Sequence, residues 1–388
     1  MRHQRHCLAA LSLLLLPLSY ARAQTIGKYV PINAGSDADH ATREINAATD
    51  PAEKLALIDK FAAGPGQGDM AIVADDLYVN YYLGQKNYDK TFEWGDKLFV
   101  LDPDNFTNAV NMIRAASEKG DVDKLLHYGD IAGGILQRFK ASPPPEGVSA
   151  DEWPGRKKST LDSNADGIRY VEVAVYSGIY NTQAPAQRAE RLTRFAKAFP
   201  DSQYANVAMG VAATSYQQAQ NAPKMLETAN ALLVKDPDNL GMLLLLSDYY
   251  SDRGEQLDKA EEYAKKAATL ADSAPKAEGM SDEQWQHQKT LQKGIALSAL
   301  GQVYLQKKDN VKAVTSLQAA APLLKSDDVS YGRNQYRLGF AYLNLKKVSE
   351  ARTALTEAAT TKGPYQSVAQ DKLKTLPAAP AGARKKTS

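Results

Sequence analysis

The sequence predicts an all-α protein built as a solenoid, in which helical units stack one upon the next. The first observation is an internal repeat, since Asp102-Pro103-Asp104-Asn105 recurs 134 positions later as Asp236-Pro237-Asp238-Asn239. The same offset matches further residues, among them Phe61 with Phe195, Tyr82 with Tyr216, Leu98 with Leu232 and Val100 with Val234. The second observation is helical spacing of apolar residues between the repeated stretches. Repetition of this kind indicates stacked units more than a single globular core.

Residues 1–23 have the pattern of a secretory signal. Arg2 and Arg5 precede an apolar run from Leu8 to Tyr20, and Ala21-Arg22-Ala23 supplies small residues for cleavage. The run is too short to cross a bilayer about 30 Å thick. We therefore expect an exported chain, periplasmic or secreted, that is not an integral membrane protein once the signal is removed.

The charge and cysteine content restrict the possible partners and chemistry. Without the three arginines of the expected signal, 44 basic residues stand against 45 acidic ones, so we expect no basic face for nucleic acid. The only cysteine, Cys7, lies in the expected signal. The exported part would then have no disulfide, no thiol nucleophile and no cysteine metal site.

The remaining chain divides into a leader, a long helical array and a tail. Residues 24–35 show no helical period and are expected to form a loose leader. The array is expected over residues 36–376, beginning with a short helix after Ser36 and a second helix at Asp50-Pro51, where a capping residue precedes proline. Residues 377–388 are rich in Pro, Ala, Gly and basic residues and are expected to be disordered.

The clearest repeat unit lies between Gln335 and Pro364. Its distinctive positions are Leu338-Gly339, Tyr342, Ala351, Leu355, Ala358 and Pro364. Small residues at 339 and 351 would let two helices approach closely, and large ones at 338 and 342 would fill the space between them. A tyrosine recurs at one position of successive units, so we expect a packing role for Tyr82, Tyr180, Tyr216, Tyr250, Tyr304 and Tyr342.

This unit resembles the tetratricopeptide repeat (TPR), a 34-residue pair of antiparallel helices. The resemblance covers residues 36–376, strongly after Asp236 and weakly before Ile72. It implies a right-handed superhelix of about eight units and sixteen helices, followed by a closing helix. It also implies a concave groove, lined by the first helix of each pair, that binds protein or peptide partners.

The resemblance also indicates which residues would face that groove. The candidates are Asn80, Arg114, Glu118, Asn181, Thr214, Gln217, Asp248, Asp252, Gln302, Arg333, Tyr336 and Asn344. Some family members hold a C-terminal carboxylate with lysine and asparagine. Here Asp76 stands where the first such lysine is expected from Asn80, which argues against that mode.

Two excursions, near residues 140–160 and 274–290, interrupt the array. Each carries an Glu-Gly-x-Ser stretch followed by a tryptophan, Trp153 in the first and Trp285 in the second. The tryptophans either tuck over the array or act as aromatic anchors for a partner.

No catalytic or metal site is expected. His40, His127 and His287 show no metal-ligand spacing, and no Gly-x-Ser-x-Gly elbow occurs. Residues 162–167 match the first half of a calcium loop, but Val173 stands where the bidentate acid belongs, so a helical or capping role is favoured.

These observations predict an exported bacterial scaffold or adaptor without cofactors, which binds protein or peptide partners. Two alternatives stay open. One is a glycan- or small-ligand-binding protein that uses Trp153 and Trp285, which requires both indoles to be exposed. The weaker one is an enzyme, for which no converging acid, base and nucleophile can be named.

Overall fold

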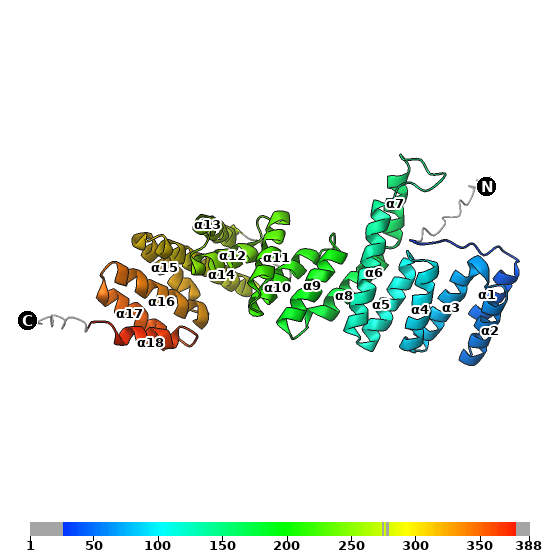
Figure 1. The fold of residues 1–388 in the computed structure, drawn as a ribbon, viewed down its shortest axis with the longest axis horizontal. Coiled ribbons are helices and arrows are strands. Elements are labelled where there is room, and N and C mark those ends of the chain that lie inside the picture. Colours follow the sequence, from blue (N-terminus) through cyan, green and yellow to red (C-terminus); the bar gives the residue numbers. More distant parts are fainter. Residues whose placement is uncertain (1–25, 274, 277–278, 378–388) are drawn as a thin grey trace, which may run out of the picture. The chain divides into compact units, whose positions relative to one another are not determined.

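The computed structural model describes residues 26–273, 275–276 and 279–377, which contain eighteen α-helices, one short 3-10 helix and no strand. The all-α class predicted from the sequence is confirmed. The chain divides into two compact units, Met1–Gly178 and Ile179–Ser388, which we name unit 1 and unit 2 (Figure 1). The expected signal and nearly all of the expected tail lie outside the described residues.

Unit 1 is a stack of helix pairs in which each helix from α1 to α5 packs against the next. Helices α3 and α5, which begin successive pairs, also contact each other. The elements are α1 (Asp37–Ala47), α2 (Pro51–Ala63), η1 (Gly68–Met70), α3 (Ala71–Gly84), α4 (Tyr88–Leu101), α5 (Phe106–Lys119), α6 (Val122–Ala141), α7 (Trp153–Ser163) and α8 (Ala165–Tyr180).

Unit 2 repeats this arrangement. Its first helices α10, α12, α14 and α16 each contact the next one in the series. The elements are α9 (Pro185–Ala198), α10 (Ala205–Gln218), α11 (Ala222–Lys235), α12 (Leu240–Arg253), α13 (Leu257–Ser273), α14 (Asp282–Gln306), α15 (Asn310–Leu324), α16 (Asp328–Asn344), α17 (Val348–Thr360) and α18 (Gln366–Lys374). Each unit is therefore a TPR-like α-solenoid, and α18 packs on α17 as the closing helix.

The repeated Asp-Pro-Asp-Asn stretch forms the joint between two helix pairs in each unit. Helix α4 ends at Asp102, and the side chain of Asn105 caps α5 by accepting a hydrogen bond from the Asn108 N–H at 2.9 Å. In unit 2, α11 ends at Asp236 and Asn239 caps α12 in the same way. Proline stops the first helix and asparagine starts the second.

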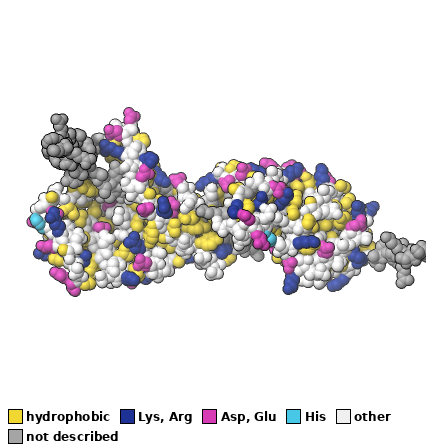
Figure 2. Space-filling view, turned by 180° about the vertical axis from the view of Figure 1, so that it is seen from behind, with side chains coloured by type: hydrophobic (Ala, Val, Ile, Leu, Met, Phe, Trp, Pro, Cys, Tyr) yellow, Lys and Arg dark blue, Asp and Glu magenta, His cyan; other side chains and the backbone are white. Residues whose placement is uncertain are grey.

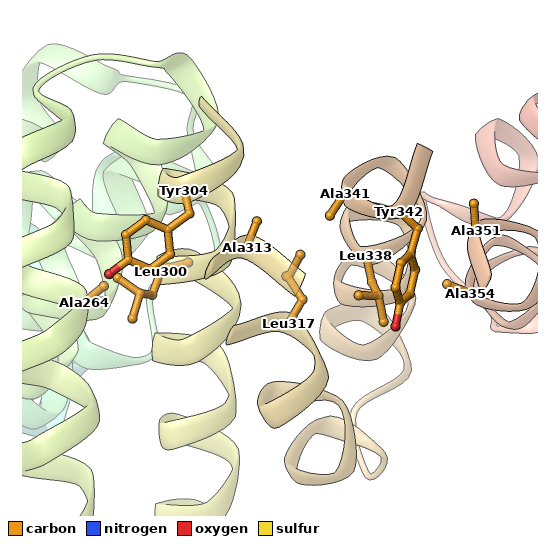
Figure 3. Packing of buried hydrophobic residues seen from close by; sticks show 11 residues of the cluster. Ala264, Leu300, Tyr304, Ala313, Leu317, Leu338, Ala341, Tyr342, Ala351 and Ala354 are labelled. Atoms are coloured by element: carbon orange, nitrogen blue, oxygen red, sulfur yellow. The ribbon is translucent and has the colours of Figure 1, made fainter. Parts of the chain in front are cut away.

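Small residues bring the paired helices together as the sequence predicts. A Cβ added to Gly339 on α16 would lie 2.5 Å from Leu355 on α17, so only glycine fits at this crossing. Leu338 and Tyr342 are buried beside it, in a cluster that continues through Leu300 and Tyr304 (Figure 3).

The predicted tyrosine packing position holds for most of its members. Tyr216, Tyr250, Tyr304 and Tyr342 are buried, and Tyr82 is partly buried. Tyr180 is 44% exposed, so the packing role predicted for it is wrong. It is the last residue of α8, where the helix ends before the ring can be enclosed.

The first excursion forms a helical projection from unit 1. Helix α6 is 20 residues long, and α7 packs beside its far end (Figure 1). The Trp153 indole Nε1 donates to the Ser142 carbonyl at 2.9 Å, and the ring meets Phe139 edge-on. In the second excursion Trp285 lies in the first turn of α14, a single helix of 25 residues.

The half calcium motif forms a helix junction. Helix α7 ends at Ser163, Asn164 follows as its cap, and α8 begins at Ala165. Asp162 pairs with Lys158 one turn earlier at 2.6 Å. The helical or capping role favoured by the sequence describes these residues.

The leader differs from the loose segment expected from the sequence. Ile26 is only 3% exposed, and the backbone N–H of Lys28 donates to the buried carboxylate of Asp102 at 2.9 Å. From there the segment runs back across unit 1 to α1 (Figure 1). No helical period is found in this segment because it is extended and its partners lie far along the chain.

Candidate functional site

The groove residues named from the sequence are distributed over the first helices of both units. In unit 1 they are Asn80 on α3 and Arg114 and Glu118 on α5. In unit 2 they are Asn181 at the unit's start, Thr214 and Gln217 on α10, Asp248 and Asp252 on α12, Gln302 on α14, and Arg333, Tyr336 and Asn344 on α16.

The three candidates of unit 1 contact neighbouring polar or aromatic groups. Asn80 accepts from the Asn111 amide at 3.2 Å, and Glu118 accepts from the Tyr88 hydroxyl at 3.0 Å. The guanidinium of Arg114 lies 5.7 Å from the centre of the Tyr170 ring.

Asp76 lies between two cavities that the leader helps to enclose. The larger, of about 540 Å³, is lined by Ile32, Asp76 and Asn80 among others. The smaller, of about 210 Å³, is lined by Tyr29, Val30 and Asp76 among others. Burial raises the pKa of the Asp76 carboxyl to about 6, although the Asn80 amide, 3.0 Å away, favours the ionised form.

We expect Asp76→Asn to stabilise unit 1 at neutral pH. The carboxyl of Asp76 has a pKa of about 6 in the folded chain and an ordinary pKa of 3.8, so its ionisation costs folding free energy in full above pH 6 and nothing below 3.8. The variant should raise the free energy of unfolding by about 2 kcal/mol at pH 7.5 and by less at pH 5. Urea unfolding at both pH values measures this.

A matched control is Asp69→Asn, which changes an exposed carboxyl in the same unit. Its effect should stay within about 0.5 kcal/mol at either pH. A gain for Asp76→Asn that did not shrink between pH 7.5 and pH 5 would contradict the assigned cause.

Four charged side chains of α12 and α16 gather in one ion-pair cluster in unit 2. Arg333 pairs with Asp248 at 2.6 Å, and Arg337 pairs with Asp252 and, at 3.4 Å, with Asp248. Arg337 also donates to the Ser298 hydroxyl on α14 at 3.3 Å. Burial disfavours the charge on Asp248, but the two guanidinium groups outweigh it and hold the pKa of that carboxyl below its usual value.

These pairs connect α12 to α16 across α14, which lies between them in the stack. Three of the four residues were named from the sequence as separate groove candidates, and Arg337 was missed. A signal was present, because Asp248 and Asp252 stand four residues apart on one first helix and Arg333 and Arg337 four apart on another. Side chains at that spacing share a helix face.

A cavity of about 350 Å³ lies beside this charged cluster. It is lined by Gln302, Leu305 and Gln306 of α14 and by Tyr336, Arg337, Phe340 and Asn344 of α16. The rings of Tyr336 and Phe340 are 4.9 Å apart at their centres. The cavity thus brings together three groove candidates, Gln302, Tyr336 and Asn344. It combines aromatic walls with amide groups that can both donate and accept hydrogen bonds.

The remaining candidates of unit 2 do not join this cavity. Asn181, Thr214 and Gln217 are exposed. The Thr214 hydroxyl donates to the carbonyl of Val211 in its own helix at 3.0 Å.

The two tryptophans lie in different local environments. The Trp153 ring is partly buried and its indole N–H is bonded within unit 1, which runs against the exposed indole that glycan stacking requires. Trp285 is partly buried at the start of α14 in unit 2.

The described part of the chain shows neither a metal-binding cluster nor a helix suited to span a membrane. No group of three or more His, Cys, Asp or Glu side chains there could hold a metal ion. No helix in that part is both long and apolar enough to cross a membrane. The face drawn in Figure 2 mixes basic and acidic side chains over both units.

Comparisons with known proteins yield structural likenesses only. No family model matches the chain, and no curated protein does. The chain is similar to a chain of the APC/C hetero-tetramer Cut9–Hcn1, with 13% identity and a TM-score of 0.41, covering 87% of this chain and 62% of that one. Yeast Tom70 gives 10% identity and a TM-score of 0.37, covering 89% and 65%. NprR in complex with its cognate peptide NprX gives 14% and 0.32, covering 88% and 84%.

The chain thus spans less than two thirds of the length of the first two structures. All three TM-scores lie below 0.5, so the assignment of a TPR-like solenoid rests on the helix pairs of this chain itself.

Proposed function

We propose that this chain is an exported, non-catalytic scaffold or adaptor of a bacterial envelope, which holds a peptide segment of a partner protein in the α14–α16 cavity of unit 2. Export is inferred from the signal-like pattern of residues 1–23. Bacterial origin is inferred from the overall character of the sequence. The binding role rests on the cavity, because it gathers three residues that the repeat resemblance places in a groove.

The chemistry of the cavity favours a peptide over a charged small molecule. Arg337, its only cationic lining residue, is committed to Asp252 and Asp248. The amides of Gln302, Gln306 and Asn344 can pair with peptide N–H and C=O groups, while Leu305 and the two rings can enclose an apolar side chain. The partner would therefore present an extended segment with an apolar or aromatic residue.

We expect the double variant that combines Gln302→Ala with Asn344→Ala to bind the partner protein much more weakly. Affinity capture from envelope extracts, with captured proteins quantified by mass spectrometry, should show at least one protein depleted about ten-fold relative to the wild type. Gln302 is partly buried, Asn344 is exposed, and neither belongs to the ion-pair cluster, so the melting temperature should change little.

The matched control is Thr214→Ala with Gln217→Ala, which removes two groove candidates of the same unit outside the cavity. This variant should capture the same proteins as the wild type. If both double variants gave unchanged capture, the cavity would not be the binding site.

A further inference from the structure

In unit 1 the joint between α4 and α5 holds an extended segment of the chain's own leader. The Phe106 N–H, which has no partner inside α5, donates to the carbonyl of Ile26 at 3.2 Å. The Lys28 N–H donates to Asp102 at 2.9 Å, and the Lys28 Nζ donates to the carbonyl of Leu101 at 2.7 Å. Most of the hydrogen bonds that hold the leader on this joint are therefore made by backbone groups and by one carboxylate.

The residue between these two contacts must be glycine. Gly27 has φ +119°, and an added Cβ would lie 2.7 Å from the Asp102 carboxylate and 3.0 Å from the Cα of Asn105. Ile26 before it is buried. The joint thus recognises an aliphatic residue, then glycine, then a residue that donates its N–H.

The joint between α11 and α12 in unit 2 has the same residues and the same backbone. Asp102 has φ −139° and ψ 87°, and Asp236 has φ −133° and ψ 82°. The capping residues agree as closely, with φ −71° and ψ 93° at Asn105 and φ −64° and ψ 96° at Asn239. In each joint a basic side chain of a later helix also pairs with the second aspartate, Arg138 with Asp104 and Lys266 with Asp238.

The joint of unit 2 differs in having no segment seated on it among the described residues. The N–H of Leu240, the counterpart of Phe106, donates to no described acceptor. Asp236 is partly exposed where Asp102 is buried, and its Oδ2 accepts the side-chain amide of Asn239 at 2.9 Å instead of a backbone N–H. The carboxylate takes the nearest local donor when no peptide supplies one.

The repeat places an uncovered apolar side chain on the same side of this joint, because Val207 corresponds to Val73, which lines one cavity together with Asp102 and Asn105. Val207 on α10 is 53% exposed, whereas its counterpart Val73 on α3 is partly buried and lines both cavities that the leader helps to enclose. Gly210 and Gly241 replace Asp76 and Thr107, so the surface around Val207 has fewer side chains to obstruct a segment.

We propose that the joint around Asp236 and Leu240, together with Val207, is a docking site for an extended segment of a partner protein that contains an aliphatic residue followed by glycine and a basic residue. The leader of the same chain stays on unit 1, since its covalent attachment gives it a high effective concentration there. A second copy would have to release its own leader first, which makes it the less favourable occupant. This surface is separate from the α14–α16 cavity and does not depend on it.

The probe for this site is a fluorescent, acetylated peptide copied from residues 26–32, titrated into the full chain and followed by anisotropy. We expect one peptide to bind per chain. Asp236→Ala and, independently, Val207→Asp should each weaken binding about ten-fold or more. A peptide with valine in place of the glycine should not bind, because its Cβ would meet the carboxylate.

The matched control is Val234→Asp, which places the same charge at a valine of unit 2 that is 83% exposed and lies on α11. This variant and Gln302→Ala with Asn344→Ala should bind the peptide as the wild type does. Equal affinity for the wild type, Asp236→Ala and Val207→Asp would overturn the site. A concentration-dependent dimer that Gly27→Val abolishes would identify a second copy as the occupant and overturn the assignment to a partner protein.

Discussion

Replacing Arg337 by methionine should lower the free energy of unfolding of unit 2 by about 3 kcal/mol, because it removes one member of a buried ion-pair cluster. Arg337 is 4% exposed, and its guanidinium contacts Asp252, Asp248 and Ser298. Methionine fills part of the volume but leaves Asp248 with a single cationic partner in a poorly solvated position. Urea unfolding measures the loss.

The control for this prediction is Arg253→Met, which removes an exposed arginine from α12 in the same unit. This control should lower the free energy of unfolding by no more than about 0.5 kcal/mol. In the background of Asp252→Asn, Arg337→Met should cost less than it does alone, since the two residues interact directly. Equal costs in the two backgrounds would show that Arg337 acts by packing alone.

Gly339→Ala should destabilise unit 2 by about 2 kcal/mol, although alanine is the better helix former. The added methyl group would overlap Leu355, so α16 and α17 would have to move apart. Overlap at a buried crossing outweighs the gain in helix propensity. Thermal or urea unfolding gives the magnitude.

At Gly155 we expect alanine to increase the free energy of unfolding. This glycine lies in α7, and no neighbouring atom lies within 4 Å of an added Cβ. Gly155→Ala should stabilise by about 0.5 to 1 kcal/mol. A loss of stability at both glycines would mean that close helix approach is not what Gly339 provides.

Local features of the fold could be predicted because their causes are local. Glycine and alanine at helix crossings, proline at the joint and asparagine at the cap each act on neighbours a few residues away, and the structure places Gly339, Pro103 and Asn105 in those roles. The exposed ring of Tyr180 shows the limit of this reasoning. Helix α8 ends at that residue, so the packing role predicted from the repeat fails there.

The candidate site was harder to predict because it depends on distant pairs. The repeat resemblance names Asp248 and Arg333 as separate groove candidates, but only the packing of α12 and α16 on α14 brings the two side chains within 2.6 Å. The leader contact at Asp102 joins residues 74 positions apart and leaves no helical period to detect. The duplicated Asp-Pro-Asp-Asn joint is the sequence feature that helps most, since the leader bound at the joint of unit 1 indicates what kind of segment the joint of unit 2 would bind.

The same leader contact has a consequence for folding kinetics. Helices that pack against their sequence neighbours close short loops and can form early, whereas the leader must close a loop of 74 residues and the Arg337–Asp252 pair one of 85. We therefore expect both contacts to form late, after the helix pairs on either side are in place. Weakening them should speed unfolding and leave the folding rate nearly unchanged. The two contacts would therefore slow the unfolding of an array that otherwise assembles from local contacts.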